Sequence, residues 1–532
     1  MLRIFSALLL TGYLASVPAQ AEVQTGAAKS EKPPAATTTE AAPRSATPAR
    51  PAAPPALDPA QVALAEKLYI QHCVSCHGVN RLGGMGPALL PENLARLKPA
   101  EAKSVIAGGR PATQMPAFAD KLAPDEIETL SAYVYLPPAA PPVWSLADIK
   151  SSHIVNFAPN TLPDKPVFTA DMDNLFIVVE LGDHHATLLD GVKFEPIHRF
   201  PTRFALHGGP KYSPDGRYVY FASRDGWISK FDIYNLKTVA EIRAGINTRN
   251  LAVSFDGRYA IAANYLPRNL VILDAETLAP LQVIDAGSRV SAVYTAPPRN
   301  SFIAAMKDLK EVWEIPYDKP SADGSFSIRK IATGDYLDDF FFDQDYTRLI
   351  GASRDGKTGQ VLDLASGAKV ADIPLGGMPH LGSGITFRSQ GKTVLATPHL
   401  NEGKVTVIDM SNWQVIKQIE TLGPGFFMRS HDNSAYAWVD VFFGPNKENV
   451  HVIDKETLTI QQTLRPAPGK TAAHVEFTKD GRYALLSIWD DDGAIVVYDS
   501  KTLKEIKRIP MKKPSGKYNV YNKTRYQAGT SH

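Results

Sequence analysis

Cysteine is almost missing from this chain of 532 residues, which contains only Cys73 and Cys76. A disulfide framework needs more cysteines at wider spacings, so disulfides are not expected to hold the fold together. The chain also lacks an excess of one charge, because 57 Lys and Arg residues face 55 Asp and Glu residues, a formal net charge of +2. This balance argues against nucleic acid or a membrane surface as the partner.

Long apolar runs are lacking beyond the N-terminal segment "MLRIFSALLLTGYLASVPAQA". That segment has one basic residue, an apolar stretch and the small-residue signal Ala19-Gln20-Ala21, which is typical of a cleaved secretory signal. Its apolar stretch is too short and broken to span a bilayer. We therefore expect residues 1–21 to be a signal peptide and the mature protein to be soluble, periplasmic and without a membrane span.

Two segments follow that differ sharply in composition. Residues 22–56 consist largely of Ala, Pro, Thr and Ser, cannot bury apolar area, and are expected to form a disordered linker. Residues 57–138 are predicted to be helical. One helix is expected to begin at Asp58-Pro59 and another in "APDEIETLSAYVYL", with apolar faces formed by Val62, Ala65, Leu68 and Tyr69 and by Ile127, Leu130 and Val134.

From about residue 145 to residue 532 the sequence alternates short apolar strands with turns. "DGRY" recurs at 215–218, 256–259 and 480–483, and phrases such as "ILDAETLAPLQVI" and "VIDKETLTIQQTL" repeat a strand, an Asp, a turn and a strand. Repeats spaced about 40–50 residues apart are typical of a β-propeller, here with about eight blades. A sandwich array or two smaller propellers are the alternatives.

The two cysteines lie in "HCVSCHG", which contains the C-x-x-C-H motif of covalent haem attachment. The thiols of Cys73 and Cys76 can bond both vinyl groups of one porphyrin, and His77 then binds the iron. A redox-active or metal-binding CxxC is the alternative. The position of the motif at the start of a small helical domain favours one covalent haem c.

A second axial ligand is expected from the later part of this domain. "GGRPATQMPAFAD" offers Met115, whose thioether suits ferrous iron, and "LGGMGPALL" offers Met85 as the alternative. Residues 57–138 resemble class I cytochromes c, in which the M-P-x-F phrase carries the ligand. This resemblance favours Met115 and implies a domain that transfers one electron at a time.

Histidines and arginines recur near the expected blade starts, where a propeller directs its loops toward a central channel. The histidines are His207, His380, His399, His431 and His474, and the arginines are Arg203, Arg224, Arg249, Arg268 and Arg289. Each histidine alone is most simply a turn or inner-strand residue, and each arginine a solvated one. Together, the arginines suit a ligand that carries several carboxylates.

The propeller resembles the cytochrome cd1 family over nearly its whole length. The phrases that carry the resemblance include "FALHGGPKYSPDGRY", "GINTRNLAV", "GGMPHLGSGITF", "ATPHL" and "KPSGKYNVYN". The resemblance implies a propeller that binds haem d1, with His207 as the proximal iron ligand. It further implies that Arg203, Arg224 and Arg249 meet the carboxylates of the tetrapyrrole and that Tyr265 lines its pocket.

Nitrite-reducing members of this family carry two distal histidines that donate protons. One matches His380, but the stretch that should hold the other, "NSFIAAMKDLKEVWEIPYD", contains Lys307 and Lys310 and no histidine. A lysine with an ordinary pKa is a poor proton donor near neutrality. This difference favours the branch of the family that makes haem d1, whose members desaturate a propionate of dihydro-haem d1 to an acrylate.

In that branch His207 and His380 lie on opposite sides of the substrate iron, and haem c removes the electrons. A base is needed beside the carbon that loses its hydrogen, and His474 is our candidate. Tyr518 and Arg525 are weaker candidates for the pocket, and His399 receives no role. The expected partners are the tetrapyrrole, a soluble electron acceptor such as a small cytochrome c, and nitrite reductase or another haem d1 carrier.

Three other functions are kept as alternatives. The first is nitrite reduction with a substitute proton donor, and the second is a non-catalytic haem d1 carrier, which would need no haem c. The third is a quinone-linked sugar or amine dehydrogenase, which would need calcium-binding acids or a cysteine-derived cofactor in the propeller, where no cysteine is present.

Overall fold

The computed structural model describes residues 57–525, except 85, 95, 96, 110–114, 205 and 355. The expected signal peptide and the expected linker therefore lie outside the described residues. Within them, no helix is long and apolar enough to cross a membrane.

The N-terminal part of the described chain is helical, as its composition predicted. Asp58 caps the first helix, since its carboxylate accepts a hydrogen bond from the Gln61 backbone N–H, and Ala65, Leu68 and Tyr69 form the buried face. The α-helices are α1 (Pro59–His72), α2 (Val74–His77), α3 (Pro91–Leu94), α4 (Pro99–Gly108), α5 (Pro124–Tyr133), α6 (Leu146–Ser151) and, at the other end of the chain, α7 (Val520–Thr524). Short 3-10 turns are η1 (Val79–Arg81), η2 (Met172–Asn174), η3 (Pro297–Arg299) and η4 (Leu381–Ser383).

The rest of the described chain forms eight antiparallel sheets, so the prediction of one eight-bladed propeller is confirmed. In chain order, six sheets are each made of four consecutive strands: β9 (Asn247–Val253) to β12 (Pro280–Asp285), β13 (Val290–Ala296) to β16 (Arg329–Ala332), β17 (Asp339–Phe342) to β20 (Lys369–Ile373), β21 (Ile385–Ser389) to β24 (Gln414–Glu420), β25 (Met428–Ser430) to β28 (Thr459–Leu464), and β29 (Ala472–Phe477) to β32 (Glu505–Met511). The strands between these ends are β10 (Tyr259–Leu266), β11 (Asn269–Asp274), β14 (Ser301–Met306), β15 (Glu311–Pro316), β18 (Arg348–Ala352), β19 (Gly359–Asp363), β22 (Lys392–Pro398), β23 (Lys404–Asp409), β26 (Tyr436–Asp440), β27 (Val450–Asp454), β30 (Tyr483–Ile488) and β31 (Gly493–Asp499).

The other two sheets each include a strand from outside the local repeat. In one sheet β1 (Ile154–Val155) is added at the edge of β5 (Lys211–Tyr212), β6 (Tyr218–Ala222), β7 (Trp227–Asp232) and β8 (Lys237–Arg243). In the other the last strand, β33 (Pro514–Asn519), pairs with β2 (Leu175–Glu180), followed by β3 (His185–Asp190) and β4 (Pro196–Pro201). The two ends of the propeller sequence therefore close one blade together.

The repeated phrases of the sequence form the turns of the blades. In the "SPDGR" turn between β5 and β6, Asp215 accepts hydrogen bonds from the Ser213 hydroxyl and the Arg217 backbone N–H, and Gly216 adopts a φ of 74°. In the second repeated phrase the Asp ends the third strand and accepts from the following turn, as Asp274 does from the Thr277 N–H at 2.7 Å. Both turns follow from the local hydrogen bonding of Asp side chains.

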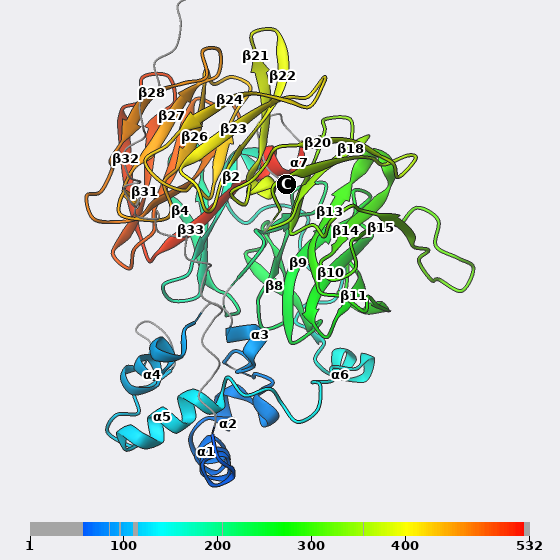
Figure 1. Cartoon of the computed structure of the whole chain (residues 1–532), viewed down its shortest axis with the longest axis vertical. Coiled ribbons are helices and arrows are strands. Elements are labelled where there is room, and N and C mark those ends of the chain that lie inside the picture. Colours follow the sequence, from blue (N-terminus) through cyan, green and yellow to red (C-terminus); the bar gives the residue numbers. More distant parts are fainter. Residues whose placement is uncertain are drawn as a thin grey trace, which may run out of the picture. The chain divides into compact units, whose positions relative to one another are not determined.

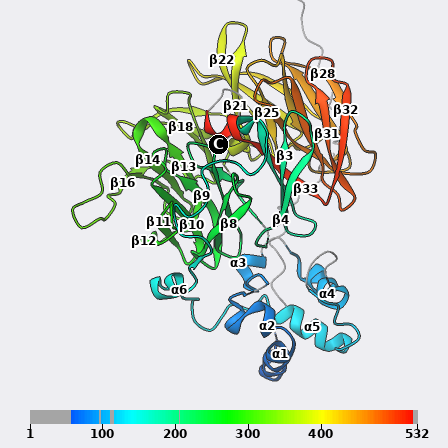
Figure 2. The same cartoon turned by 180° about the vertical axis from the view of Figure 1, so that it is seen from behind.

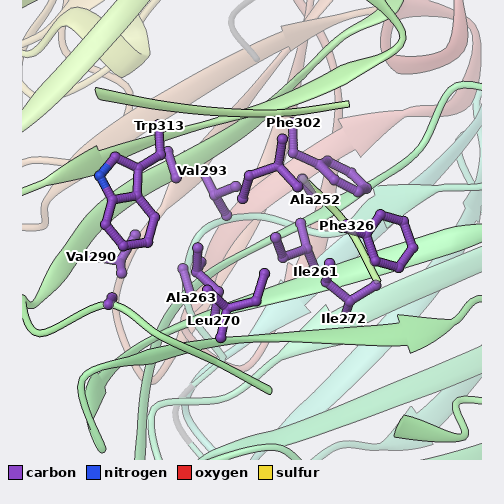
Figure 3. Packing of buried hydrophobic residues seen from close by; sticks show 14 of the residues in the cluster. Ala252, Ile261, Ala263, Leu270, Ile272, Val290, Val293, Phe302, Trp313 and Phe326 are labelled. Atoms are coloured by element: carbon purple, nitrogen blue, oxygen red, sulfur yellow. The ribbon is translucent and has the colours of Figure 1, made fainter. Parts of the chain in front are cut away.

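The core consists of apolar side chains that fill the space between neighbouring sheets. Figure 3 shows the contact between the β9–β12 sheet and the β13–β16 sheet, where Ile261 and Leu270 of the first sheet approach Val293 and Phe302 of the second. All four of these side chains are fully buried. Such layers fix each blade against the next, and they leave the inner strand ends and the loops that follow them to shape the centre.

The C-terminal helix α7 lies between the green sheets and the yellow-to-red sheets in both views (Figures 1 and 2). It packs against β2, β5 and β33, and the Asn519 side chain caps it by accepting from the Asn522 backbone N–H. The sequence analysis did not predict this helix. It brings the last described residues of the chain next to the inner strands, and so to the site described below.

Candidate functional site

The C-x-x-C-H motif bends sharply between α1 and α2. Cys73 and Cys76 are both half-buried, and the His77 ring donates from Nδ1 to the Pro87 carbonyl oxygen at 2.8 Å. This bond fixes the ring and leaves Nε2 as the nitrogen that can bind iron. Burial lowers the pKa of His77, which keeps the imidazole in the neutral form that metals require. These residues fit a covalently attached haem.

An apolar wall lies beside this motif. Leu68, Phe118 and Leu130 belong to a buried cluster against which Cys73 packs. Burial raises the pKa of the Cys73 thiol to about 11, so this group remains a thiol until it is attached. Met115 is half-buried in the segment that follows α4, whereas Met85 lies outside the described residues. Met115 as the second axial ligand therefore stays a prediction.

A cavity of about 390 Å³ lies within the propeller. This volume is within the range of small-molecule and cofactor sites. The cavity gathers residues that the sequence analysis had selected from distant segments, namely His207, Arg224, Arg249, His380 and His474. The weaker candidate Tyr518 also lines it, but Arg525 does not.

His207 lies just before β5, where its backbone N–H donates to the Ala222 carbonyl oxygen. Its Nδ1 donates to the Arg249 carbonyl oxygen at 2.7 Å, and its Nε2 accepts from Arg249 Nη1 at 2.8 Å. The first bond fixes the ring and leaves Nε2 as the nitrogen that could bind a metal. An iron atom bound at Nε2 would need the place that Arg249 Nη1 occupies.

The glycines after His207 have a specific reason to be glycine. Gly208 and Gly209 have φ values of 80° and 67°, which side chains disfavour. A Cβ atom on Gly209 would lie 2.9 Å from the Tyr518 ring, and one on Gly208 would lie 2.9 Å from the Asn250 side chain. These glycines therefore also let Tyr518 and Asn250 approach the backbone that carries His207.

His380 approaches the cavity from the loop that precedes η4 and β21. Its backbone N–H donates to the Pro398 carbonyl oxygen, and its Nδ1 bonds the Phe426 carbonyl oxygen at 2.5 Å. Its Nε2 lies 3.9 Å from Asp339 Oδ2. The ring packs on Phe426, with 4.3 Å between the ring centroids. Main-chain and aromatic contacts thus orient this imidazole at the cavity.

His474 occupies an irregular position in the inner strand β29. The pairing with β30 shifts register between Ala473 and Val475, and His474 has a φ of 53°. A bulge of this kind re-aims a side chain, and here the ring lies edge-on to Phe427 and Tyr518 at 4.7 and 5.1 Å. Burial lowers the pKa of His474 well below its ordinary value, so the ring is neutral at pH 7.

Asp440 holds the backbone on two sides of the cavity. Its carboxylate accepts from the N–H groups of Phe426, Phe427 and His474 at 2.7, 3.0 and 3.1 Å. Burial nevertheless raises the pKa of Asp440 to about 6. The carboxyl group thus links the segment that orients His380 to the bulge that orients His474.

This raised pKa predicts a pH-dependent stability. A folded pKa above the unfolded value means that the contribution of Asp440 is greatest at low pH and is lost as the pH rises through the folded pKa. Between about pH 4 and pH 6 the wild-type protein should lose roughly 3 kcal/mol of unfolding free energy relative to Asp440→Asn. Denaturant titrations of both proteins at several pH values measure this difference. Parallel curves would show that Asp440 titrates normally.

Two predicted pocket residues, Arg203 and Tyr265, do not line this cavity. The Arg203 guanidinium binds Glu241, with Nη2 and Oε2 2.6 Å apart, and lies over the Trp227 ring at 3.8 Å. The Tyr265 ring is 5.8 Å from the Arg249 guanidinium. The resemblance to the cytochrome cd1 family had placed both residues at the ligand together with Arg224 and Arg249.

The other residues selected from the sequence also lie outside the cavity wall. Lys307, in the stretch without the second distal histidine, bonds Asp338, a cavity residue, and does not line the cavity itself.

His399 and His431 are fully buried but do not line the cavity, and they follow β22 and β25. The predicted blade-start position was wrong for His399, which follows the second strand of its blade, whereas His431 directly follows the first strand of its blade. Arg268 and Arg289 pair with Asp308.

Sequence reasoning missed several polar residues of the cavity wall, namely Lys211, Asp338, Asp339, Arg354 and Lys523. Lys211 follows His207 by only four positions, and it stands on the two-residue inner strand β5. That proximity was the signal that could have selected it. Lys523 comes from α7, whose placement no local pattern indicates.

Comparisons with known proteins agree with this layout. Residues 170–523 match the family described as the Cytochrome D1 heme domain. Residues 60–134 match the family described as Cytochrome C oxidase, cbb3-type, subunit III. The first family covers the propeller and the second the helical region with the C-x-x-C-H motif.

Two curated relatives and one solved structure extend over most of the chain. The chain is 59% identical to the dihydro-heme d1 dehydrogenase of Pseudomonas aeruginosa, over 90% of this chain and 97% of that protein. It is 27% identical to the nitrite reductase of Stutzerimonas stutzeri, over 88% of this chain and 94% of that protein. A solved structure described as "Dihydro-heme d1 dehydrogenase NirN in complex with DHE" has a TM-score of 0.84 at 59% identity, covering 87% of this chain and all of that one.

The resemblance inferred from the sequence is therefore confirmed, and with it a helical cytochrome c region and a propeller of the haem d1 type. This chain belongs to the cytochrome d1 haem-domain family.

Proposed function

We propose that this protein is a dihydro-haem d1 dehydrogenase, which converts a propionate side chain of its substrate to an acrylate. The single observation that carries this proposal is the 59% identity to the dihydro-heme d1 dehydrogenase, which spans both the C-x-x-C-H region and the cavity. In the reaction, the group –CH2–CH2–COO⁻ becomes –CH=CH–COO⁻ and releases two protons and two electrons. The alternative of nitrite reduction is less well supported, because the stretch that should hold the second distal histidine contains Lys307 and Lys310 instead, and Lys307 is bound to Asp338.

The cavity residues have complementary proposed roles. His207 binds the iron of the substrate from one side, and His380 binds it from the other. Arg249, released from His207, and Arg224 pair with carboxylates of the tetrapyrrole. Arg203 and Tyr265 act indirectly, since Tyr265 lies beside Arg249 and Arg203 fixes Glu241.

One of the cavity residues must remove hydrogen from the side chain. His474 is our first candidate, because its ring is neutral and lines the cavity. Tyr518 is the second, since its ring lies 5.1 Å from that of His474. Burial raises the pKa of Tyr518 to about 12, so at neutral pH only its small ionised fraction could accept a proton, which ranks Tyr518 after His474.

Haem c, held through Cys73 and Cys76 and bound by His77, supplies one-electron acceptance when present. Met115 is proposed as its other axial ligand. The proposed acceptor beyond it is a small soluble cytochrome c, and the finished cofactor passes to nitrite reductase or another haem d1 carrier. We propose a periplasmic location on the basis of residues 1–21.

An anaerobic assay tests the function directly. Haem c-loaded protein is mixed with dihydro-haem d1, and the extracted pigment is identified by mass. The expected result is a loss of two hydrogen atoms together with reduction of haem c. An unchanged pigment with oxidised haem c would reject the dehydrogenase. A parallel sample loaded with mature haem d1 and given nitrite would reveal nitric oxide formation if the protein were a reductase.

Two substitutions separate the candidates for hydrogen removal. His474→Gln and Tyr518→Phe each remove one titratable group with little change in volume. The variant that lacks the essential group should lose at least about 100-fold in kcat with a small change in KM, as for general acid–base groups, and the other should lose less than about 10-fold. Steady-state kinetics across pH 6–9 provide the measurement. If both variants keep wild-type kcat, neither residue removes the hydrogen.

A further inference from the structure

A group of basic side chains lies on the part of the cavity wall next to His474. Lys211 of β5 and Lys523 of α7 line the cavity. The two elements pack against each other, and Lys523 Nζ lies 5.7 Å from the centre of the Tyr518 ring. Behind them Lys517 and Arg429 are buried, with 0% and 2% of their surfaces exposed. Four basic side chains therefore gather around this part of the cavity wall.

The carboxylates near this cluster accept hydrogen bonds from other groups of the protein. Glu476 accepts from Arg429 at 3.3 Å and from the Asn522 amide at 3.0 Å. Asp440 accepts the three backbone N–H groups described above. Asp339 accepts from the Tyr294 hydroxyl at 3.0 Å and from the Gly382 N–H at 2.6 Å. These carboxylates thus hold the backbone and the side chains around the cluster.

Burial and repulsion from Arg429 disfavour the charged forms of the two cavity lysines. Burial, with repulsion from Arg429, lowers the pKa of Lys211 to about 8. The same two causes, in the same order, lower the pKa of Lys523 well below its ordinary value. An anion that enters the cavity would offset both effects and restore the charged form of each lysine. Among the described residues, this wall is therefore suited to an anionic group of a ligand.

We propose that Lys211 and Lys523 form the subsite that binds the carboxylate of the side chain that is desaturated, an inference that rests on the proposed function. This carboxylate must lie near the group that removes hydrogen. Lys523 lies beside the Tyr518 ring, and Lys211, whose charge acts on Lys523, stands on β5, which packs against α7. As the C–H bond next to the carboxylate breaks, negative charge grows on the carboxylate oxygens, where a nearby ammonium group stabilises it. The two C–H bonds that break yield one new carbon–carbon π bond, two protons and two electrons, and a haem c held by Cys73, Cys76 and His77 would supply the one-electron acceptor.

The first test compares methionine and arginine substitutions. Lys211→Met and Lys523→Met keep the length and the apolar part of the side chain, whereas Lys211→Arg and Lys523→Arg keep the charge. Each Met variant should lose at least about 10-fold in kcat and in affinity for dihydro-haem d1, since one charge-assisted partner is lost, and each Arg variant should recover most of the affinity. Binding is measured by anaerobic absorbance titration, independently of turnover.

Lys230→Met is the matched control. Lys230 is also buried, with 3% of its surface exposed, and burial lowers its pKa to about 8 as well. Its Nζ donates to the Glu276 carbonyl oxygen at 2.8 Å, and it does not line the cavity. This variant is expected to bind and convert the substrate as the wild type does. If all three Met variants lose folding stability, the loss comes from removing an enclosed lysine. If only the Lys211 and Lys523 variants lose binding, the loss comes from the subsite.

A chemical variant of the ligand sharpens the test. Wild-type protein should bind dihydro-haem d1 more tightly than its fully methyl-esterified form, and the double variant Lys211→Met/Lys523→Met should show a smaller difference. If the double variant retains wild-type binding, turnover and discrimination, the lysines are structural and the subsite is rejected. If instead the wild-type protein does not desaturate the substrate at all, the proposed function is rejected. The binding titrations do not depend on turnover, so they still test the subsite.

Discussion

Replacing His207 with alanine is expected to abolish most binding of dihydro-haem d1 and nearly all turnover. The His207 ring is held by the Arg249 carbonyl oxygen, so its Nε2 is presented in one fixed direction. Loss of this iron ligand should weaken binding by at least about 100-fold, which corresponds to about 2.7 kcal/mol. It should also change the absorbance spectrum of the bound tetrapyrrole. Anaerobic titration followed at the visible absorption bands measures both effects.

His431→Ala provides the control for this result. His431 is also buried at the end of an inner strand, with 3% of its surface exposed, but it does not line the cavity. Its Nε2 contacts the Lys479 carbonyl oxygen at 3.2 Å, so its removal affects folding stability rather than the ligand. If His207→Ala bound the tetrapyrrole with the wild-type spectrum and affinity, the assignment of His207 as iron ligand would be rejected.

The second large effect is expected from Cys73→Ser/Cys76→Ser. Without the two thiols no thioether bonds form, so the protein should carry no covalent haem after denaturation. The two electrons released per substrate then have no internal acceptor, and steady-state turnover should fall to the background rate. The propeller does not depend on these residues, and the affinity for dihydro-haem d1 should stay within about 2-fold of the wild-type value. Mass measurement of the denatured chain and substrate titration test both statements.

Ser75→Ala is the matched change within the same turn. The Ser75 hydroxyl lies 3.9 Å from Cys76 Sγ and is exposed, so its removal should leave haem attachment and turnover intact. Product formation by the double cysteine variant at the wild-type rate, without an added oxidant, would contradict the electron path through haem c.

Much of the fold could be predicted because the relevant signals are local. The Asp-Gly-Arg turn occurs in three blades and an Asp ends the third strand of most blades, and each forms its hydrogen bonds within a few residues. Asp58 and Pro59 likewise specify the start of α1. By contrast, α7 is five residues long and gains its place from contacts with strands far away in the sequence. Its position could not be derived from local propensity.

The candidate site was predictable in part for the same reason. His207, His380 and His474 meet at the cavity because each stands on or next to an inner strand of its blade. The side-chain direction of Arg203 could not be derived, because Glu241 and Trp227, which hold it, come from later strands. Nor could the role of Lys523 be assigned, since it depends on where α7 is placed.

The pairing of β33 with β2 sets the order in which this protein can become functional. The Ser515 hydroxyl bonds the Val179 carbonyl oxygen across 336 positions of the chain. Contacts of such long range form late in folding, so β2 keeps an open edge until almost the whole chain has emerged. Tyr518 and Lys523 belong to the closing segment, and the tetrapyrrole cavity is therefore completed last. A ligand that spans this seam binds only the closed ring, and it therefore raises the free energy of unfolding by an amount that grows with the logarithm of its concentration above Kd.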